Sequence, residues 1–408
     1  MSSEVDGSGV AGEPSLWAML GQVLYIGTIG YGGPTALTYL RNIFVTERGW
    51  FSEGEFLEAM SLAQVLPGST GVTAMSYFGY RRYGYFGALV FPLVFLTPSI
   101  VAILVLSWAY FSYGQLSFVQ PLFVGLGALV VALLLSATLS LGSAVFTGGR
   151  RRILPGLVIT AATFVGSLGF RINLILLVLI SGLLGLALFW GLKEPEVPPS
   201  VGGEAEHRPG GSSTSLSRFV PLVVTGVLLA VVLAGADTRT LFVSFFQVGL
   251  LAFGGGFASV ALLQHVVVDQ MGWLSFRQFR DGIALGQVTP GPVLITAGFV
   301  GYKVSGVIGA LAATFGIFLP PALLIVMVAD LHDRLKSNRI VKGVVGGFQC
   351  GFIGLVAAIT IQFGLGSLIS WQTWLIFGSS FVLVRWFKRS AGWAILGTVV
   401  FALVFIRA

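Results

Sequence analysis

The sequence is short of charged residues. Of its 408 residues, 10% are Asp, Glu, Lys or Arg, whereas 55% are hydrophobic and the mean hydropathy is +0.92. Soluble globular domains carry about 25% charged residues. A membrane-spanning helix needs roughly 20 apolar residues, and uncharged stretches such as 87–111 and 123–141 have a suitable length. We therefore expect an all-α, polytopic membrane protein rather than a soluble domain.

Residues that bind metals or form disulfides are scarce too. The single cysteine, Cys350, excludes an internal disulfide and a thiolate metal cage. The three histidines, at 207, 265 and 332, lie too far apart for metal-ligand spacing. The sequence contains neither a GxxxxGK[ST] nucleotide-binding motif nor a basic–aromatic patch. We therefore expect no cofactor, no metal, no nucleic-acid partner and no ATP-driven pumping by this chain alone.

The chain contains an internal repeat. Its two parts share a glycine turn, a tryptophan-led stretch and a Pro-Gly pair, in the same order and at nearly the same spacing. Self-similarity at a fixed spacing is the sequence signature of duplication, so we expect two homologous halves. The matched pairs are Gly32-Gly33 with Gly254-Gly255, Trp50 with Trp273, Gln64 with Gln287, and Pro67-Gly68 with Pro290-Gly291.

A polar stretch separates the two halves. Residues 193–218 are rich in Pro, Gly, Ser and Glu, a composition typical of flexible, solvated linkers. Each half has six apolar segments, for example 54–80 and 84–112, and a linking segment brings the expected number of spans to about 13. The predicted order is a cytoplasmic N-terminal tail (1–14), a first repeat (15–192), the cytoplasmic linker (193–218), a linking transmembrane helix (219–236) and a second repeat (237–408).

The basic clusters lie in alternate loops. Short cytoplasmic loops of membrane proteins carry an excess of Lys and Arg, and a cytoplasmic N-terminus puts all these clusters on that side. Equivalent loops of the two halves then carry opposite charge patterns, as in an inverted-topology repeat. We expect a multi-pass protein of the cytoplasmic membrane with an external C-terminus. The basic clusters are Arg81-Arg82, Arg150–Arg152, the linker, 332–342 and 385–389, and the uncharged facing loops are 112–117 and 364–370.

Glycine and proline interrupt apolar segments at matched places. A Pro-Gly pair removes a helical N–H donor and permits unusual backbone angles, and a free backbone group in hydrocarbon is costly. Inverted-repeat transporters bind substrate at broken helices, and helix N-termini favour anions. We therefore expect broken helices at Pro67 and Pro290 whose freed backbone groups face a cavity or an anion. Alternatively, these small residues serve only close helix packing.

Five motifs resemble those of the chromate ion transporter family, in its long, two-half form. The order and spacing of the motifs agree, and the resemblance covers nearly the whole chain, although Ser69 stands where the family pattern has a second proline. The resemblance implies chromate export coupled to ion movement, with sulfate as an alternative substrate. The motifs are "YGGPTA" (31–36), "ERGWFSEGEF" (47–56), "VLPGST" (65–70), "AFGGGFA" (252–258) and "QVTPGPV" (287–293).

The anion site is expected where the duplicated turns and breaks meet. Chromate and sulfate are tetrahedral dianions, and backbone N–H groups together with nearby hydroxyl and amide side chains would suit them. Those side chains could equally serve in hydrogen bonds between helices. The predicted substrate-binding residues are Gly32, Gly33, Pro34, Thr35, Gln64, Pro67, Gly68, Ser69, Thr70, Gly254, Gly255, Gly256, Gln287, Thr289, Pro290, Gly291 and Pro292.

Four charged residues are candidates for other roles. Arg41 and Arg48 follow the first glycine turn and would attract the anion, or else are ordinary snorkelling residues at the interface. Glu58 and Asp281 occupy matched positions, each nine residues before the proline of its break. Such acids would carry a coupling proton, although an acid near a helix start also complements the helix dipole. Weaker candidates are Glu47, Glu55 and Asp330.

The sequence thus predicts a secondary oxyanion transporter and not an enzyme. Its expected partners are a small inorganic oxyanion, the lipid bilayer, a coupling ion expected to be a proton and, in a homodimer, a second copy of the chain. An anion channel would share the same cavity, and only concentrative, gradient-dependent transport separates the two. A membrane-embedded enzyme is disfavoured because the sequence has no metal-ligand set or nucleophile motif.

Overall fold

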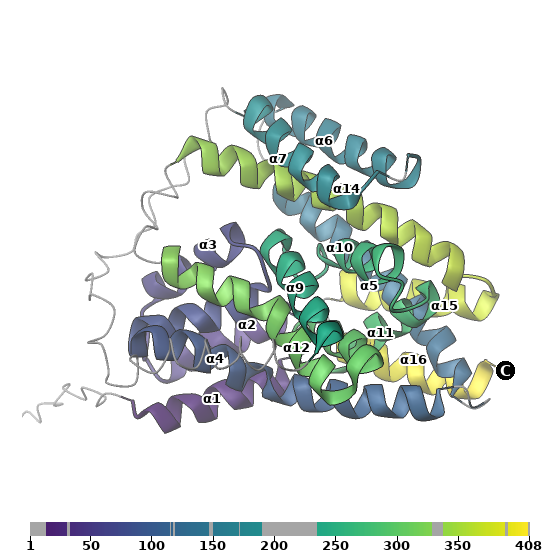
Figure 1. The fold of residues 1–408 in the computed structure, drawn as a ribbon, viewed down its shortest axis with the longest axis horizontal. Helices are drawn as coiled ribbons and strands as arrows, with labels where there is room; N and C mark the ends of the chain where they lie inside the picture. Colours follow the sequence, from purple (N-terminus) through teal and green to yellow (C-terminus); the bar gives the residue numbers. More distant parts are fainter. Residues whose placement is uncertain are drawn as a thin grey trace, which may run out of the picture.

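The regular structure of the chain is helical. The computed structural model describes residues 14–30, 33–114, 116, 119–146, 150–170, 172–189, 235–328, 338–387 and 391–406, and within these ranges it contains no β-strand (Figure 1). Outside the described residues lie nearly all of the predicted N-terminal tail, the linker, most of the linking helix, Gly32 and Asp330.

The helices follow the two halves of the chain. The first half contains α1 (Leu16–Ile29), α2 (Gly33–Arg41), η1 (Asn42–Glu47), α3 (Glu53–Val65), α4 (Thr70–Tyr113), α5 (Gln120–Val145), α6 (Arg150–Leu168) and α7 (Leu174–Phe189). The second half contains α9 (Ala236–Leu251), α10 (Val260–Gln264), η3 (His265–Gln270), α11 (Phe276–Val288), η4 (Val293–Ile295), α12 (Thr296–Val328), α14 (Arg339–Ser367), α15 (Trp371–Arg385) and α16 (Ala391–Phe405).

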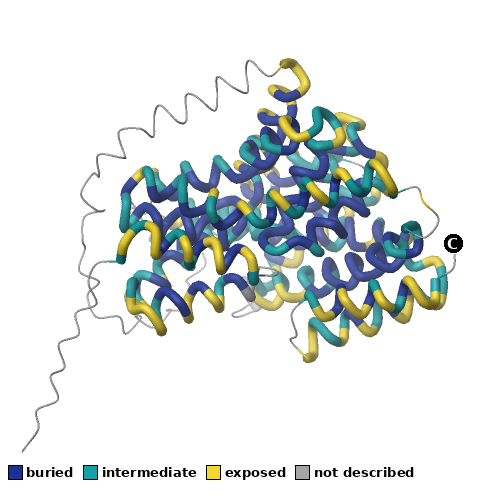
Figure 2. Tube along the Cα trace, turned by 90° about the horizontal axis from the view of Figure 1, so that it is seen from below, coloured by how far each residue is buried: buried dark blue, intermediate teal, exposed yellow. Residues whose placement is uncertain are grey.

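Several of these helices suit a membrane. By length and composition, α4, α5, η4 with α12, and α14 could cross a bilayer, and α1, α7, α16 and most of α6 are shorter apolar helices. Buried residues line the faces where helices meet, whereas exposed residues lie on the outer faces (Figure 2). Large apolar side chains such as Leu365 and Trp386 are among the exposed ones, as expected of a surface that meets lipid. The chain is therefore a multi-pass membrane protein.

Local structures recur between the two halves. In each half a π-helical turn, η1 or η3, is followed by a glycine with positive φ, Gly49 at +59° and Gly272 at +62°. A capping box then starts the next helix, with Ser52 before α3 and Ser275 before α11. These elements occur at the spacing of the sequence repeat, so the duplication extends to the backbone.

The long helices α4 and α12 each fold back on themselves. The backbone leaves helical geometry at Tyr83-Gly84 in α4 and at Ser305-Gly306 in α12. Residues eight apart in a continuous helix are separated by about 12 Å. Gly79 and Gly87 nevertheless approach so closely that a side chain on either would clash with the carbonyl of the other, and equivalent glycines of α12 do the same. Each helix therefore has a short arm after its break and a long spanning arm.

The last helices of each half pack on the other half. α14 packs against α6 and α7, which lie beside it at the top of Figure 1, and α5 packs against α15 and α16. The contacts are close: Gly185 of α7 faces the backbone of Gly343 and Gly347 in α14, and Gly125 of α5 faces Ala402 of α16. Small residues allow membrane helices to approach in this way. The two halves are therefore interlocked.

The two halves repeat one contact. Gly27 of α1 lies against the carbonyl of Phe95 in α4, and Gly249 of α9 lies against the carbonyl of Ile317 in α12. α4 and α12 also pack on each other. The breaks that precede these two helices are therefore held between the halves.

Candidate functional site

Two broken helices define the candidate site. α3 ends at Val65 and α4 begins at Thr70, while α11 ends at Val288 and η4 begins at Val293. Both intervening segments contain a glycine in a conformation that other residues rarely adopt, Gly68 with φ +111° and Gly291 with φ +98°. The prediction that helices break at Pro67 and Pro290 is confirmed.

Each break is hydrogen-bonded to the opposite half. The N–H of Gly68 donates to the carbonyl of Ala252, which follows α9, at 2.9 Å. The N–H of Gly291 donates to the carbonyl of Gly30, which follows α1, at 3.0 Å. We expected the freed N–H groups to face a cavity or a ligand. For these two groups that expectation is wrong, because the other half already satisfies them.

The breaks are also packed tightly. A Cβ added to Gly68 would lie 2.6 Å from the Cβ of Pro321 in α12, and one added to Gly291 would clash with Ser99 of α4. The hydroxyl of Ser99 donates to the carbonyl of Pro290 at 2.6 Å. Glycine is therefore required at both breaks for space as well as for conformation, and these residues act as a joint between the halves.

A glycine turn brings the starts of two helices together. Gly254 and Gly255 both have positive φ, +86° and +89°. A Cβ added to Gly255 would lie 3.9 Å from Oγ1 of Thr70, at the start of α4, and one added to Gly256 would lie 3.6 Å from Cβ of Val293, at the start of η4. The first N–H groups of a helix have no acceptor within the helix and carry partial positive charge. The turn therefore lies beside two helix starts, one from each half.

The hydroxyl and amide candidates have different surroundings. Ser69 is buried, and its hydroxyl does not cap α4, whereas the Thr289 hydroxyl donates to the carbonyl of Gly286 at 2.9 Å. Gln287 is buried, and its Nε2 has no acceptor among the described residues. Gln64, its sequence match, is exposed. The matched glutamines thus have different environments. Of the other predicted residues, Pro34 and Thr35 lie in the first turn of α2, which starts at Gly33.

The two arginine candidates lie on exposed parts of the first half. Arg41 pairs with Glu53 at 3.0 Å, with about half of each side chain exposed. Arg48 lies over the ring of Trp50 at 6.0 Å. Among the weaker acids, Glu47 is exposed and Glu55 completes the capping box of α3. The arginine side chains make these contacts rather than contacts with the breaks.

The two matched acids also differ. Asp281 is buried in α11 with 2% exposure, accepts a hydrogen bond from the hydroxyl of Tyr110 at 2.9 Å and pairs with Arg280 at 3.4 Å. Glu58 is half-buried near Tyr77. Sequence reasoning missed Arg280 and Tyr110. The adjacent Arg–Asp pair in an apolar segment was the available signal, but Arg280 has an apolar counterpart, Leu57, in the first half.

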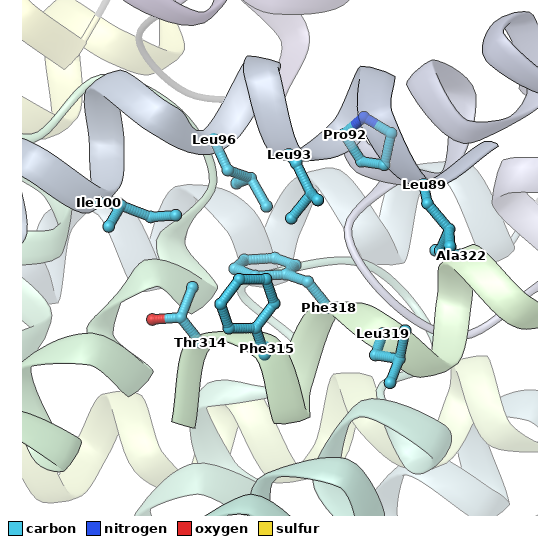
Figure 3. Close-up of a pocket in the computed structure, with 10 residues that line it drawn as sticks. All are labelled: Leu89, Pro92, Leu93, Leu96, Ile100, Thr314, Phe315, Phe318, Leu319 and Ala322. Atoms are coloured by element: carbon cyan, nitrogen blue, oxygen red, sulfur yellow. The ribbon is translucent and has the colours of Figure 1, made fainter. Parts of the chain in front are cut away.

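A cavity between α4 and α12 lies away from these residues. Its walls are apolar apart from Thr314, and none of the predicted site residues lines it (Figure 3). Among the described residues, no three His, Cys, Asp or Glu side chains come together where they could hold a metal ion. The apolar cavity is therefore separate from the predicted polar candidates.

Comparison with known proteins places the chain in a family. The sequence model described as "Chromate transporter" matches residues 17–186 and 239–404, once in each half. A probable chromate transport protein of Synechococcus elongatus is 34% identical over 356 residues, which cover 86% of each chain. A chromate transport protein of Cupriavidus metallidurans is 29% identical over 93% of this chain and 92% of its own length.

A shorter relative matches part of the chain. An uncharacterized transporter of Bacillus subtilis is 31% identical over 165 residues, which are 40% of this chain but 93% of that protein. No solved structure matches the chain. Because the family model covers both halves and the long relatives match over most of their length, the chain belongs to the chromate transporter family.

Proposed function

We propose that the chain is a secondary transporter of a tetrahedral oxyanion that exports chromate across the cytoplasmic membrane, coupled to an ion gradient. The family and the names of its long relatives support chromate as the substrate. The observation that carries the proposal is the reciprocal contact at the breaks, where Gly68 and Gly291 each bond to the other half. A substrate site between the two halves would change its geometry when one half moves relative to the other.

The proposed substrate site lies around the starts of α4 and η4. Ser69 and Thr70 contribute hydroxyls, Gln287 contributes an amide, and the turn at Gly254–Gly256 lies beside both helix starts. Helix N-termini bind oxyanions through backbone N–H groups and the helix dipole. The N–H groups of Gly68 and Gly291 hold the halves together and are not part of this donor set. The remaining predicted glycines and prolines shape the backbone around it.

The proposed mechanism uses an inverted repeat. We propose about 13 spans, with the N-terminus in the cytoplasm and the C-terminus outside, and with the second half inserted upside down relative to the first. The alternation of basic loops supports this arrangement, and the recurring local structures support an evolutionary duplication. Rocking of one repeat against the other would expose the site to each side in turn, with Asp281 as the proton site.

Sulfate is the alternative substrate, because it is also a tetrahedral dianion. A channel with the same site would conduct the anion only down its gradient. Neither sulfate nor a channel is favoured by a specific contact in the molecule, and the relatives are named as transport proteins.

Flux into proteoliposomes tests the proposal. Radiolabelled chromate flux is measured with and without a pH gradient and with sulfate as competitor. We expect gradient-dependent flux, reduced at least about tenfold in Pro67→Ala and Pro290→Ala, because alanine restores an N–H and removes the fixed φ that favours the break. Pro121→Ala is the matched control, since Pro121 lies at the start of α5, where proline is tolerated.

The outcomes separate the parts of the proposal. No flux of either anion in intact wild-type vesicles would exclude an oxyanion transporter. Flux that never exceeds electrochemical equilibrium would favour a channel. Wild-type flux in both break variants would exclude the breaks as the substrate site while leaving the substrate class in place.

Cysteine labelling tests the orientation of the two halves. The only native cysteine, Cys350, is buried. In a Cys350→Ser background, single cysteines are introduced at the exposed residues Ser112 and Ile369 and, in the polar linker, at Ser212. We expect an impermeant thiol reagent to label Ser112→Cys and Ile369→Cys from outside, and Ser212→Cys only after the membrane is permeabilised. Labelling of Ser112→Cys and Ile369→Cys from opposite sides would contradict the proposed topology.

A further inference from the structure

A buried ion pair lies beside the proposed site, on α11. Arg280 is 8% exposed and Asp281 is 2% exposed, and their side chains approach to 3.4 Å. Burying two charges is costly unless the pair is well satisfied. Ionisable residues within membrane-spanning segments are rare and commonly functional. This pair therefore calls for an explanation that helix packing does not supply.

Arg280 is only partly satisfied. Its Nη1 donates to the carbonyl of Gly366 at 2.8 Å and to the hydroxyl of Ser367 at 3.2 Å, both at the end of α14. Its Nε is buried and has no acceptor among the described residues. The Nε lies beside Gly127 of α5, where an added Cβ would be 3.2 Å away. A guanidinium with an unused N–H is a ready anion ligand, because each buried unsatisfied donor is destabilising.

A second unused donor lies on the same helix. Nε2 of Gln287 is buried and has no acceptor among the described residues. Arg280 and Gln287 are seven residues apart, which is about two helical turns or about 10 Å, and so share one face of α11. α11 then ends at the break that leads to η4. Arg280 and Gln287 thus offer N–H donors at two points along α11. They lie too far apart to bind one oxyanion together, so each would contact the anion at a different position in the pathway.

We propose that Arg280 is an anion ligand in the transport pathway, and that Asp281 occupies its guanidinium until a proton neutralises the carboxylate. The inference rests on the proposed function and adds the residue that links proton to anion. The proton from water binds a carboxylate oxygen of Asp281, while Arg280 keeps its own protons. The neutral acid attracts the guanidinium less strongly, so Arg280 is free to turn its charge to a dianion when α11 separates from α5.

The charges around Asp281 fit this role. Arg280 and the exposed Arg277 come from α11, and the Tyr110 hydroxyl comes from α4; the α5 and α14 residues at the pair, Gly127, Gly366 and Ser367, do not titrate. In the first half the matched acid, Glu58, is preceded by the exposed Leu57. The pair therefore occurs in one half of the repeat, which gives one coupling site per chain.

The sign of the coupling follows from competition. Deprotonated Asp281 competes with the anion for Arg280, whereas protonated Asp281 does not. Anion affinity is therefore highest at pH values below the pKa of Asp281 and falls as the pH rises through it. By linkage, anion binding favours uptake of a proton. Proton and anion therefore cross in the same direction, and the driving force for export is the membrane potential, which moves the net negative charge of the anion and its proton outward.

Equilibrium binding to the purified full-length protein in nanodiscs tests the inference. The probes are radiolabelled sulfate and chromate, measured between about pH 5 and about pH 8. Arg280→Gln combined with Asp281→Asn removes both charges and leaves no unpaired one, so the variant is expected to fold. We expect its affinity to fall at least about tenfold and to lose its dependence on pH. Asp281→Asn alone should bind at every pH as tightly as wild type binds at low pH.

Arg277→Gln is the control for charge alone. Arg277 lies one turn earlier on α11 and is exposed, so we expect a change of less than about threefold with the pH profile preserved. Wild-type affinity and wild-type pH dependence in the doubly neutral variant would overturn the inference and leave the proposed function intact. Absence of oxyanion binding by the wild-type protein at every pH would remove both. A loss equal in Arg277→Gln and the double variant would also overturn a ligand role for Arg280.

Discussion

At the scale of single residues, glycine sets the geometry of the joint between the halves. Gly68 needs its positive φ, and it also has no room for a side chain, because Pro321 lies directly against it. Gly49 has a positive φ of +59° but no atom within 4 Å of an added Cβ. The two positions therefore separate conformational strain from close packing.

Alanine substitution measures that difference. Gly49→Ala should lose about 1–2 kcal/mol of stability, the cost of a left-handed conformation for an L-residue. Gly68→Ala should lose more, because the added Cβ also displaces Pro321 and strains the hydrogen bond to Ala252. Thermal unfolding of the purified variants in detergent provides the comparison. Equal midpoints for the two variants would show that the contact with Pro321 is not constraining.

Arg280 shows where residue-level comparison between halves fails. Matching the repeats directs attention to positions that agree, such as Glu58 with Asp281. The strongest electrostatic feature of α11 arises where they disagree, with Arg280 opposite Leu57. The acceptors of Arg280 are Gly366 and Ser367, which lie 86 and 87 residues further along the chain. A contact of this kind depends on packing that local sequence does not encode.

At the scale of elements, the breaks and the kinks have different causes. Pro67 and Pro290 end a helix because proline lacks an N–H donor and disfavours helical geometry in the residue before it. Gly84 folds α4 back because its φ of +59° and ψ of −147° lie in a region that essentially only glycine occupies. Apolar composition alone predicts segments that end and restart near both features. It does not predict that Gly79 meets Gly87 across the kink.

The glycine turns and the residues that precede them contact the breaks of the other half. The sequence predicts that they approach the breaks, and Gly255 does lie near Thr70. The carbonyls that precede the turns, at Gly30 and Ala252, accept the N–H groups that were expected to bind substrate. A hydrogen bond within the protein is available at all times and displaces a weakly held ligand. Our proposal therefore places the anion at the helix starts and along α11.

At the scale of the whole molecule, each half packs its helices against helices of the other half. α5 packs on α15 and α16, and α14 packs on α6 and α7. The other half therefore covers the apolar faces of α5 in the first half and of α14 in the second half. In the proposed mechanism, this packing would connect the joint at the breaks to the last helices of both halves.

Splitting the chain tests the interlocking. If the chain is cut within the 193–218 linker, we expect the two fragments to yield stable protein and chromate flux only when expressed together. Each fragment alone should be degraded or aggregate, because α5 in one fragment and α14 in the other would expose small, apolar faces that the other half covers in the intact protein. Membrane fractionation and co-purification with a tag on one fragment provide the measurement. A stable, active single fragment would contradict the interlocked fold.

The amino-acid sequence by itself determined that this protein lies in a lipid bilayer, that it consists of two similar halves, and where its helices break. These properties depend on composition and on Pro and Gly at fixed places, and both act locally. Tertiary structure alone decided which donors the breaks keep, which half covers each long helix, and that Arg280 and Asp281 are paired and buried. These properties depend on contacts between residues far apart in the chain, where packing determines which polar groups find a partner.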